Sequence, residues 1–225
     1  LTVALFGVLR PGDSVLAVSG MPYDTIRGVI FGEGNGSLKD FGISFEKTDL
    51  TETGKFDKQK IAEDIKRLGG SLKMIYIQRS RGYEWRDALS EEKIRKICSF
   101  VRSCGFTGCI FVDNCYGEFT EEQEPVGVGV DAMAGSLIKN PGGGIAPTGG
   151  YIAGTKKAID RIEHALTAPG IGRACGSYEA SYRPVYQGFF LAPAVTASAV
   201  KTAILFAQVF SRLGYEVNPA PEAMR

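Results

Sequence analysis

The chain has 225 residues, of which 44% are hydrophobic and 23% are charged, and its formal net charge is +1. This composition is typical of a soluble globular protein. It offers neither the strongly basic surface that nucleic acids require nor an acidic tail, so we expect no nucleic-acid partner. The length suits one large domain, or one domain with an appendage.

The five cysteines indicate a reducing compartment. Their number is odd, and no two of them have the CxxC spacing. Neither a disulfide framework nor a zinc site is therefore indicated. We expect buried, reduced thiols in a cytoplasmic protein without a metal site.

In the first half of the chain, strand and helix patterns alternate. Residues 1–9 resemble the apolar end of a helix. At 90–102, Ser90 is placed to cap a helix, and Glu91 and Glu92 lie in its first turn. Apolar spacing and glycine stops predict the other elements: strands at 14–18, 41–45 and 72–77, and helices at 23–30 and 57–68.

The second half continues the alternation. Strands are predicted at 109–112, 130–134 and 150–153, helices at 156–166 and 192–213, and the start of a further strand at 214–217. The most apolar late stretch, 189–210, includes Pro193 and Lys201. We expect it to be a buried helix and not a membrane span.

This order of elements predicts an α/β fold of three layers, α/β/α, around a mostly parallel sheet. In such sheets, ligands bind beyond the carboxyl ends of the strands. The interruption at 167–172 favours a boundary, with one domain at 1–165 and a second segment at 166–225 that contains the long helix.

Asp113 and Lys139 both follow predicted strands. Lys139 comes three residues after Ser136 and opens a glycine-rich turn. A lysine amine, a carboxylate and a hydroxyl are the groups that hold pyridoxal phosphate through its aldehyde, its pyridine nitrogen and its phosphate. Desolvation and nearby positive charge are expected to lower the pKa of Lys139 and favour the neutral amine. The alternatives are a surface lysine, a turn aspartate and a loop serine.

Other polar and aromatic residues are weaker candidates. Tyr23 follows a short strand, where its ring could stack on a cofactor or simply pack in the core. Arg79 and Arg81 could hold a phosphate or a substrate carboxylate, or could be solvated loop charges. Asn114 is expected to stabilise a turn. The glycines at 142–150 form neither a GxxxxGK[ST] nor a strand-linked GxGxxG motif, which argues against a nucleotide enzyme.

On these residues the chain resembles the fold-type I pyridoxal phosphate enzymes of cysteine and methionine metabolism. The nearest resemblance is to the methionine gamma-lyase-like family, which includes cystathionine beta-lyase-like proteins involved in aluminium resistance. The segments that carry it are 5–13, 20–25, 78–83, 112–119, 135–144, 147–154 and 167–172.

The resemblance implies a role for each position. Lys139 would be the Schiff-base lysine, Asp113 would pair with the pyridine nitrogen, Ser136 would contact the phosphate, and Tyr23 would stack on the ring. The large domain at 1–165 would have the aspartate aminotransferase-like fold. The segment at 166–225 would connect it to the start of a small C-terminal domain. A phosphate loop upstream and a substrate-binding arginine downstream are missing, so we expect a fragment of a longer protein.

The expected activity is that of a carbon–sulfur lyase acting on a sulfur-containing amino acid through Lys139. Relatives of this kind are dimers or tetramers, which implies a homodimer or homotetramer. Two alternatives stay open: another pyridoxal phosphate reaction, such as transamination or racemisation, and a non-catalytic, cofactor-free remnant that acts by oligomerisation.

Overall fold

The computed structural model describes residues 1–168, 170–176 and 180–223. One six-stranded sheet runs through it in the order β2-β1-β3-β4-β5-β6. The pairs from β2 to β5 are parallel, and β6 is antiparallel to β5. The strands are β1 (Ser14–Ala17), β2 (Ser44–Lys47), β3 (Leu72–Gln78), β4 (Cys109–Asp113), β5 (Ala132–Ser136) and β6 (Gly150–Gly154). The predicted α/β fold with a mostly parallel sheet is confirmed.

Six α-helices and several short 3-10 helices complete the described part. The α-helices are α1 (Thr2–Val8), α2 (Asp24–Phe31), α3 (Lys58–Leu68), α4 (Glu91–Ser103), α5 (Lys156–Ile162) and α6 (Arg183–Arg212). The 3-10 helices are η1 (Gly69–Ser71), η2 (Pro125–Val128), η3 (Asn140–Gly142), η4 (Glu163–Ala165) and η5 (Gly172–Ala174). Side-chain caps fix three helix starts: Asp57, Ser90 and Thr155 accept from the backbone N–H groups of Lys60, Lys93 and Ala158.

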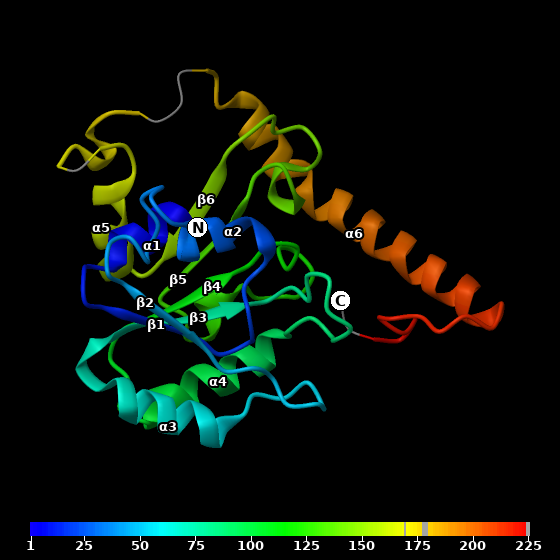
Figure 1. Ribbon diagram of the computed structural model, residues 1–225. Coiled ribbons are helices and arrows are strands. Elements are labelled where there is room, and N and C mark those ends of the chain that lie inside the picture. The colour runs from blue at the N-terminus through cyan, green and yellow to red at the C-terminus, as the bar shows by residue number, and fades with distance from the viewer. Residues whose placement is uncertain (169, 177–179, 224–225) are drawn as a thin grey trace.

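Two apolar cores cover the two faces of the sheet. Successive residues of a strand point to opposite faces, so in β3 Ile75 and Ile77 join one core, while Met74 and Tyr76 join the other. Helices α3 and α4 cover the first face, and α1, α2 and α5 cover the second (Figure 1). The three layers are those that the alternating pattern predicted.

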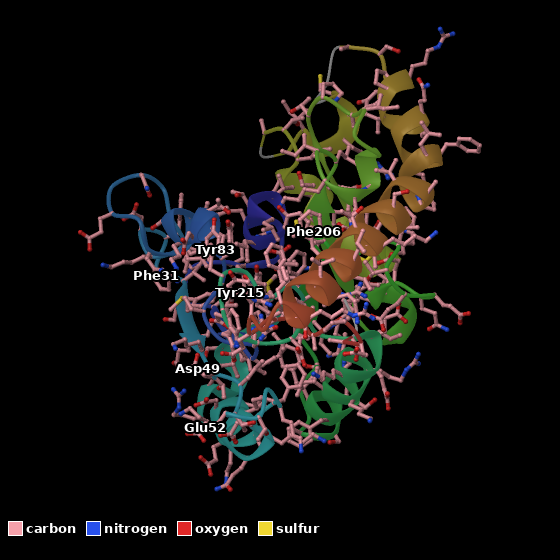
Figure 2. The ribbon with its side chains drawn as sticks, turned by 90° about the vertical axis from the view of Figure 1, so that its right-hand side faces the viewer. Phe31, Asp49, Glu52, Tyr83, Phe206 and Tyr215 are labelled. Carbon is pink, nitrogen blue, oxygen red and sulfur yellow. The ribbon has the colours of Figure 1, made fainter. Side chains whose placement is uncertain are left out.

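Helix α6 departs from its prediction. It begins at Arg183, before the predicted start at residue 192, and includes Pro193. The expectation of a buried helix is wrong, because only 11% of its most apolar 18-residue window is buried. Figure 1 shows it running away from the sheet, and Phe206, labelled in Figure 2, is 58% exposed. Helix α6 is long enough and apolar enough to cross a membrane, judged by its length and composition alone.

The predicted strand at 214–217 is also wrong. The chain turns at Gly214, which adopts a φ of 89° that glycine tolerates, and the following residues form no strand. Tyr215 instead packs its ring against Phe210 of α6, with 5.8 Å between the ring centroids.

The start of α6 packs backbone to backbone on the turn after Lys139. A Cβ atom at Gly188 would lie 2.1 Å from the carbonyl oxygen of Gly142, and one at Gly143 would lie 2.3 Å from that of Gly188. We therefore expect Gly188→Ala to lower the free energy of unfolding by about 1–3 kcal/mol, as overpacking does.

Thermal unfolding measures this effect. The matched control is Gly28→Ala in α2, where a Cβ atom meets nothing within 4 Å. That change should leave stability unchanged or raise it by roughly 0.5–1 kcal/mol. Equal effects of the two substitutions would contradict the close packing of α6.

Candidate active site

A cavity of ≈ 590 Å³ lies at the carboxyl ends of the parallel strands. Its wall includes Asp113 at the end of β4, Lys139 after β5, Tyr23 after β1 and Arg81 after β3. Helix α6 closes one side with Thr196, among other small or apolar residues. The chain thus brings three of the four predicted site residues to one cavity, at the sheet edge where ligands of α/β proteins bind.

The Asp113 carboxylate is buried at the end of β4, with 5% of the residue exposed. It accepts hydrogen bonds from the Tyr76 hydroxyl at 3.3 Å and from the backbone N–H of Cys115 at 3.2 Å. Among the described residues, none of the ion pairs includes it. The Lys139 amine acts on Asp113 electrostatically without forming a direct ion pair. A buried carboxylate with no direct ion pair is costly, so this site suits a ligand that brings a positive charge into contact with it.

Lys139 lies in the turn between β5 and η3, where its backbone N–H donates to the carbonyl of Ser136 at 3.2 Å. Its Nζ atom is 4.4 Å from the ring centroid of Tyr116. Burial lowers its pKa, but the neighbouring Cys115, Tyr116 and Asp113 outweigh that effect and raise the pKa above its ordinary value. The predicted lowering of the pKa is therefore wrong for the cofactor-free protein, because Cys115, Tyr116 and the Asp113 carboxylate lie beside the amine.

Tyr23 is fixed at the mouth of the cavity. Its backbone N–H donates to the Gln78 side chain at 2.6 Å, and its hydroxyl donates to that of Tyr83 at 2.7 Å. The hydrogen bond with Tyr83 raises the pKa of Tyr23 to about 12. The two rings pack with their centroids 5.3 Å apart, so an aromatic surface borders the cavity.

Ser136 is placed differently from the other three. It is the last residue of β5, paired with Gly150 of β6, and it is not among the residues that line the cavity. Its carbonyl supports the Lys139 turn. A phosphate contact by its hydroxyl stays a prediction.

The two arginines after β3 have different environments. Arg79 is buried, with 2% exposed, and bonds to Glu121 at 2.6 Å and to the Asn114 side chain at 2.8 Å. Arg79 is therefore not a solvated loop charge, whereas its predicted contact with a phosphate or a substrate carboxylate stays a prediction, because it belongs to the cavity wall. Arg81 lines the cavity and donates to the backbone and side-chain oxygens of Asn218. Asn114 stabilises its turn, as predicted.

The cysteines are all free, as expected of reduced thiols. Cys98 is buried, but Cys175 is exposed, which corrects the expectation that all would be buried. Cys115 belongs to the site: it lines the cavity beside Asp113 and Lys139, and burial raises the pKa of its thiol to about 12. Within the described ranges, no cluster of three metal-binding side chains occurs.

The sequence did not predict the buried polar cluster that Glu118 forms with Tyr151 of β6. Glu118 is 3% exposed, and its Oε1 atom accepts from the Tyr151 hydroxyl at 2.8 Å. Its Oε2 atom has no hydrogen-bond partner in the described part of the chain. Burial raises the pKa of Glu118 to about 7. Only the fold could reveal it, because Glu118 and Tyr151 are far apart in sequence.

This pKa makes stability depend on pH. A folded-state pKa above the ordinary value of 4.5 means that the contribution of protonated Glu118 is fully present below pH 4.5 and is lost as the pH rises through about 7. We expect Glu118→Gln to remove this loss. Its stability relative to the wild type should grow by up to about 3 kcal/mol between pH 4.5 and 8 in urea unfolding.

Glu122→Gln, which changes an exposed glutamate of the same segment, is the control and should keep the wild-type pH profile. Parallel profiles for the wild type and Glu118→Gln would show that Glu118 ionises normally in the folded protein.

The residues of the cavity fit pyridoxal phosphate. A protonated pyridine nitrogen is the kind of cation that the unpaired Asp113 carboxylate lacks, and Lys139 is an amine in the same cavity. The tyrosine rings at the border offer an apolar surface for an aromatic ring. The donor set is thus that of the enzymes that hold this cofactor through a lysine.

Comparison with known proteins shows the fold and the family of the chain. The pyridoxal phosphate-dependent protein YhfS of Escherichia coli has the same fold, with a TM-score of 0.65 at 15% identity over 92% of this chain and 50% of that one. The whole chain, residues 1–225, matches the sequence pattern of the methionine gamma-lyase family, and the protein belongs to that family.

Two relatives are much more similar. Protein YnbB of Bacillus subtilis is 48% identical over 228 residues, which cover 100% of this chain and 53% of YnbB. A carbon–sulfur lyase involved in aluminium resistance from Clostridium novyi NT has a TM-score of 0.94 and 47% identity, over 100% of this chain and 53% of that structure. The chain therefore spans about half the length of these relatives.

Proposed function

We propose that the full-length protein is a pyridoxal phosphate-dependent carbon–sulfur lyase that acts on a sulfur-containing amino acid. The observation that carries this proposal is the buried Asp113 carboxylate, which has no ion-pair partner in the described chain and shares a cavity with Lys139. Membership of the methionine gamma-lyase family and the likeness to the Clostridium novyi lyase support it.

When bound, the cofactor supplies an electron sink for the negative charge that develops at the substrate Cα. Asp113 would hold the pyridine nitrogen protonated. Lys139 would hold the cofactor covalently and, once a substrate amine has replaced it, would take the proton from Cα as a general base. The proposed reaction would release a thiol from the β or γ carbon of the substrate, and hydrolysis of the remaining carbon–nitrogen skeleton would give a 2-keto acid and ammonia.

The first test is a visible absorbance spectrum of the full-length protein with added cofactor, followed by borohydride reduction and peptide mapping. We expect a visible absorbance band from the lysine-bound cofactor and a reduced adduct on Lys139. Release of thiol and keto acid from a panel of sulfur amino acids then tests the lyase reaction. Amino-group transfer or loss of optical activity without thiol release would instead support transamination or racemisation.

We also propose a cytoplasmic homodimer or homotetramer. The free cysteines fit a reducing compartment, and the exposed apolar side chains of α6 offer a surface for self-association. Size measurement of the full-length protein by light scattering tests the assembly. A folded monomer that binds no cofactor would contradict both the proposed assembly and the proposed lyase activity. An oligomer that binds no cofactor would instead support a non-catalytic remnant that acts by oligomerisation.

A further inference from the structure

The turn from residue 114 to 119 is built in an unfavourable backbone conformation. Tyr116 has a φ of 68° and Phe119 a φ of 62°, and they are the non-glycine residues with positive φ in the part that the structure describes. A large L side chain is rarely found in this left-handed region, because its Cβ atom crowds the following carbonyl. Such conformations persist only where the surroundings impose them.

A polar network imposes this turn. Asn114 is fully buried; its side-chain oxygen accepts from Arg79 at 2.8 Å and its amide donates to Glu124 at 2.8 Å. Gly117 leaves space for Arg79, since a Cβ atom there would lie 2.4 Å from the Arg79 Cδ atom. From the other side, the Asn140 amide donates to the carbonyls of Tyr116 and Glu118, at 3.2 and 3.1 Å.

Burial of its side chain does not explain why Tyr116 adopts this backbone conformation. It is 59% exposed, so its ring adds little to the apolar core. The ring of Tyr116 contacts Lys139, whose Nζ atom lies 4.4 Å from the ring centroid. A strained residue that is not buried, and whose ring covers the one lysine of the cavity, is better explained by a role at that lysine than by folding.

We propose that Tyr116 is a positioning residue that holds the Lys139 amine over the cavity and stabilises its charged form, and that the left-handed turn exists to deliver its ring. The inference rests on the proposed role of Lys139. An aromatic face attracts an ammonium group and has no comparable attraction for a neutral amine. The ring therefore stabilises the ammonium form that Lys139 reaches after it has taken the proton from the substrate Cα.

Other groups face the amine as well. Asp113 and Cys115 lie beside it and also raise its pKa. Farther along the cavity wall stand Tyr23, Tyr83, Arg79, Arg81 and Glu121, whereas α6 contributes the uncharged side chains of Thr196, Ala199, Val200 and Ala203. Removal of the Tyr116 ring leaves all these groups in place, so its own effect on Lys139 can be measured.

The test is the pH dependence of acetylation of Lys139 by acetic anhydride in the cofactor-free full-length protein, followed by peptide mass spectrometry. It needs no lyase activity, so it can fail while the proposed function stands. We expect Tyr116→Leu to lower the pH midpoint of labelling by roughly 0.5–1 unit. Tyr116→Phe keeps the aromatic face and should keep the midpoint. Tyr186→Leu, at an exposed tyrosine of α6, is the matched control.

A second variant tests the strain. Glycine adopts positive φ without crowding, so Tyr116→Gly should lower the midpoint like Tyr116→Leu and yet raise the melting temperature by roughly 2–4 °C. An unchanged midpoint in Tyr116→Leu would overturn the role of the ring. An unchanged or lower melting temperature in Tyr116→Gly would overturn the claim that the turn is held against its own preference.

Discussion

Lys139→Ala is expected to abolish covalent attachment of the cofactor and to lower kcat/KM for a sulfur amino acid by at least about 10³-fold. Two functions are lost together, because the same amine holds the aldehyde and moves the proton at the substrate Cα. Added cofactor should still bind reversibly, since Asp113 and the tyrosine surface remain. The measurements are borohydride reduction with mass spectrometry and the rate of thiol release.

The control for this experiment is Lys156→Ala. Lys156 lies at the start of α5, where it pairs with Asp160 at 2.5 Å, and it is not among the residues that line the cavity. The activity of this variant should equal that of the wild type. Full activity in Lys139→Ala would exclude the proposed mechanism, whatever cofactor the protein binds.

Arg79→Ala should cause the largest loss of stability, about 3–5 kcal/mol. Arg79 is buried and pairs with Glu121 at 2.6 Å and with Glu124 at 3.6 Å. Its removal leaves the Glu121 carboxylate without its cation and the Asn114 oxygen without its donor. Urea unfolding of the full-length protein measures the effect, and the loss of this support should also loosen the turn that carries Tyr116.

An exposed ion pair provides the comparison. Arg27 pairs with Asp24 at 3.4 Å, and both side chains are more than half exposed. Solvent screens such pairs, so Arg27→Ala should cost less than about 1 kcal/mol. Similar losses for the two arginines would mean that the Arg79 network contributes no more than a surface contact.

Much of the fold was predictable because the spacing of apolar residues along the sequence indicates the strands and helices that form its layers. The apolar runs that end at Asp113 and before Lys139 are buried parallel strands, and in a parallel sheet their carboxyl ends meet at one edge. The two residues therefore reach the same cavity although they are far apart in the chain. The segment at 166–225 contains α6, but its division from residues 1–165 as a separate domain stays a prediction.

The rest depends on contacts that no local pattern records. Burial lowers the pKa of Lys139, but Cys115, Tyr116 and Asp113 raise it above its ordinary value, and Tyr116 reaches the amine through a left-handed turn. Arg79 looks like a loop arginine in the sequence, and only its partners Glu121 and Glu124 reveal that it is buried. The apolar composition of α6 does not reveal whether the helix is buried in the protein or exposed on its surface.

The contact between Gly188 and Gly142 has a mechanical consequence. Helix α6 has 30 residues, which makes it about 45 Å long, and it touches the turn after Lys139 near its own beginning. The orientation of the helix is therefore coupled to the turn that follows Lys139. Since two backbones meet there without a side chain between them, a tilt of α6 would displace the turn that follows Lys139 together with the Thr196 side of the cavity wall.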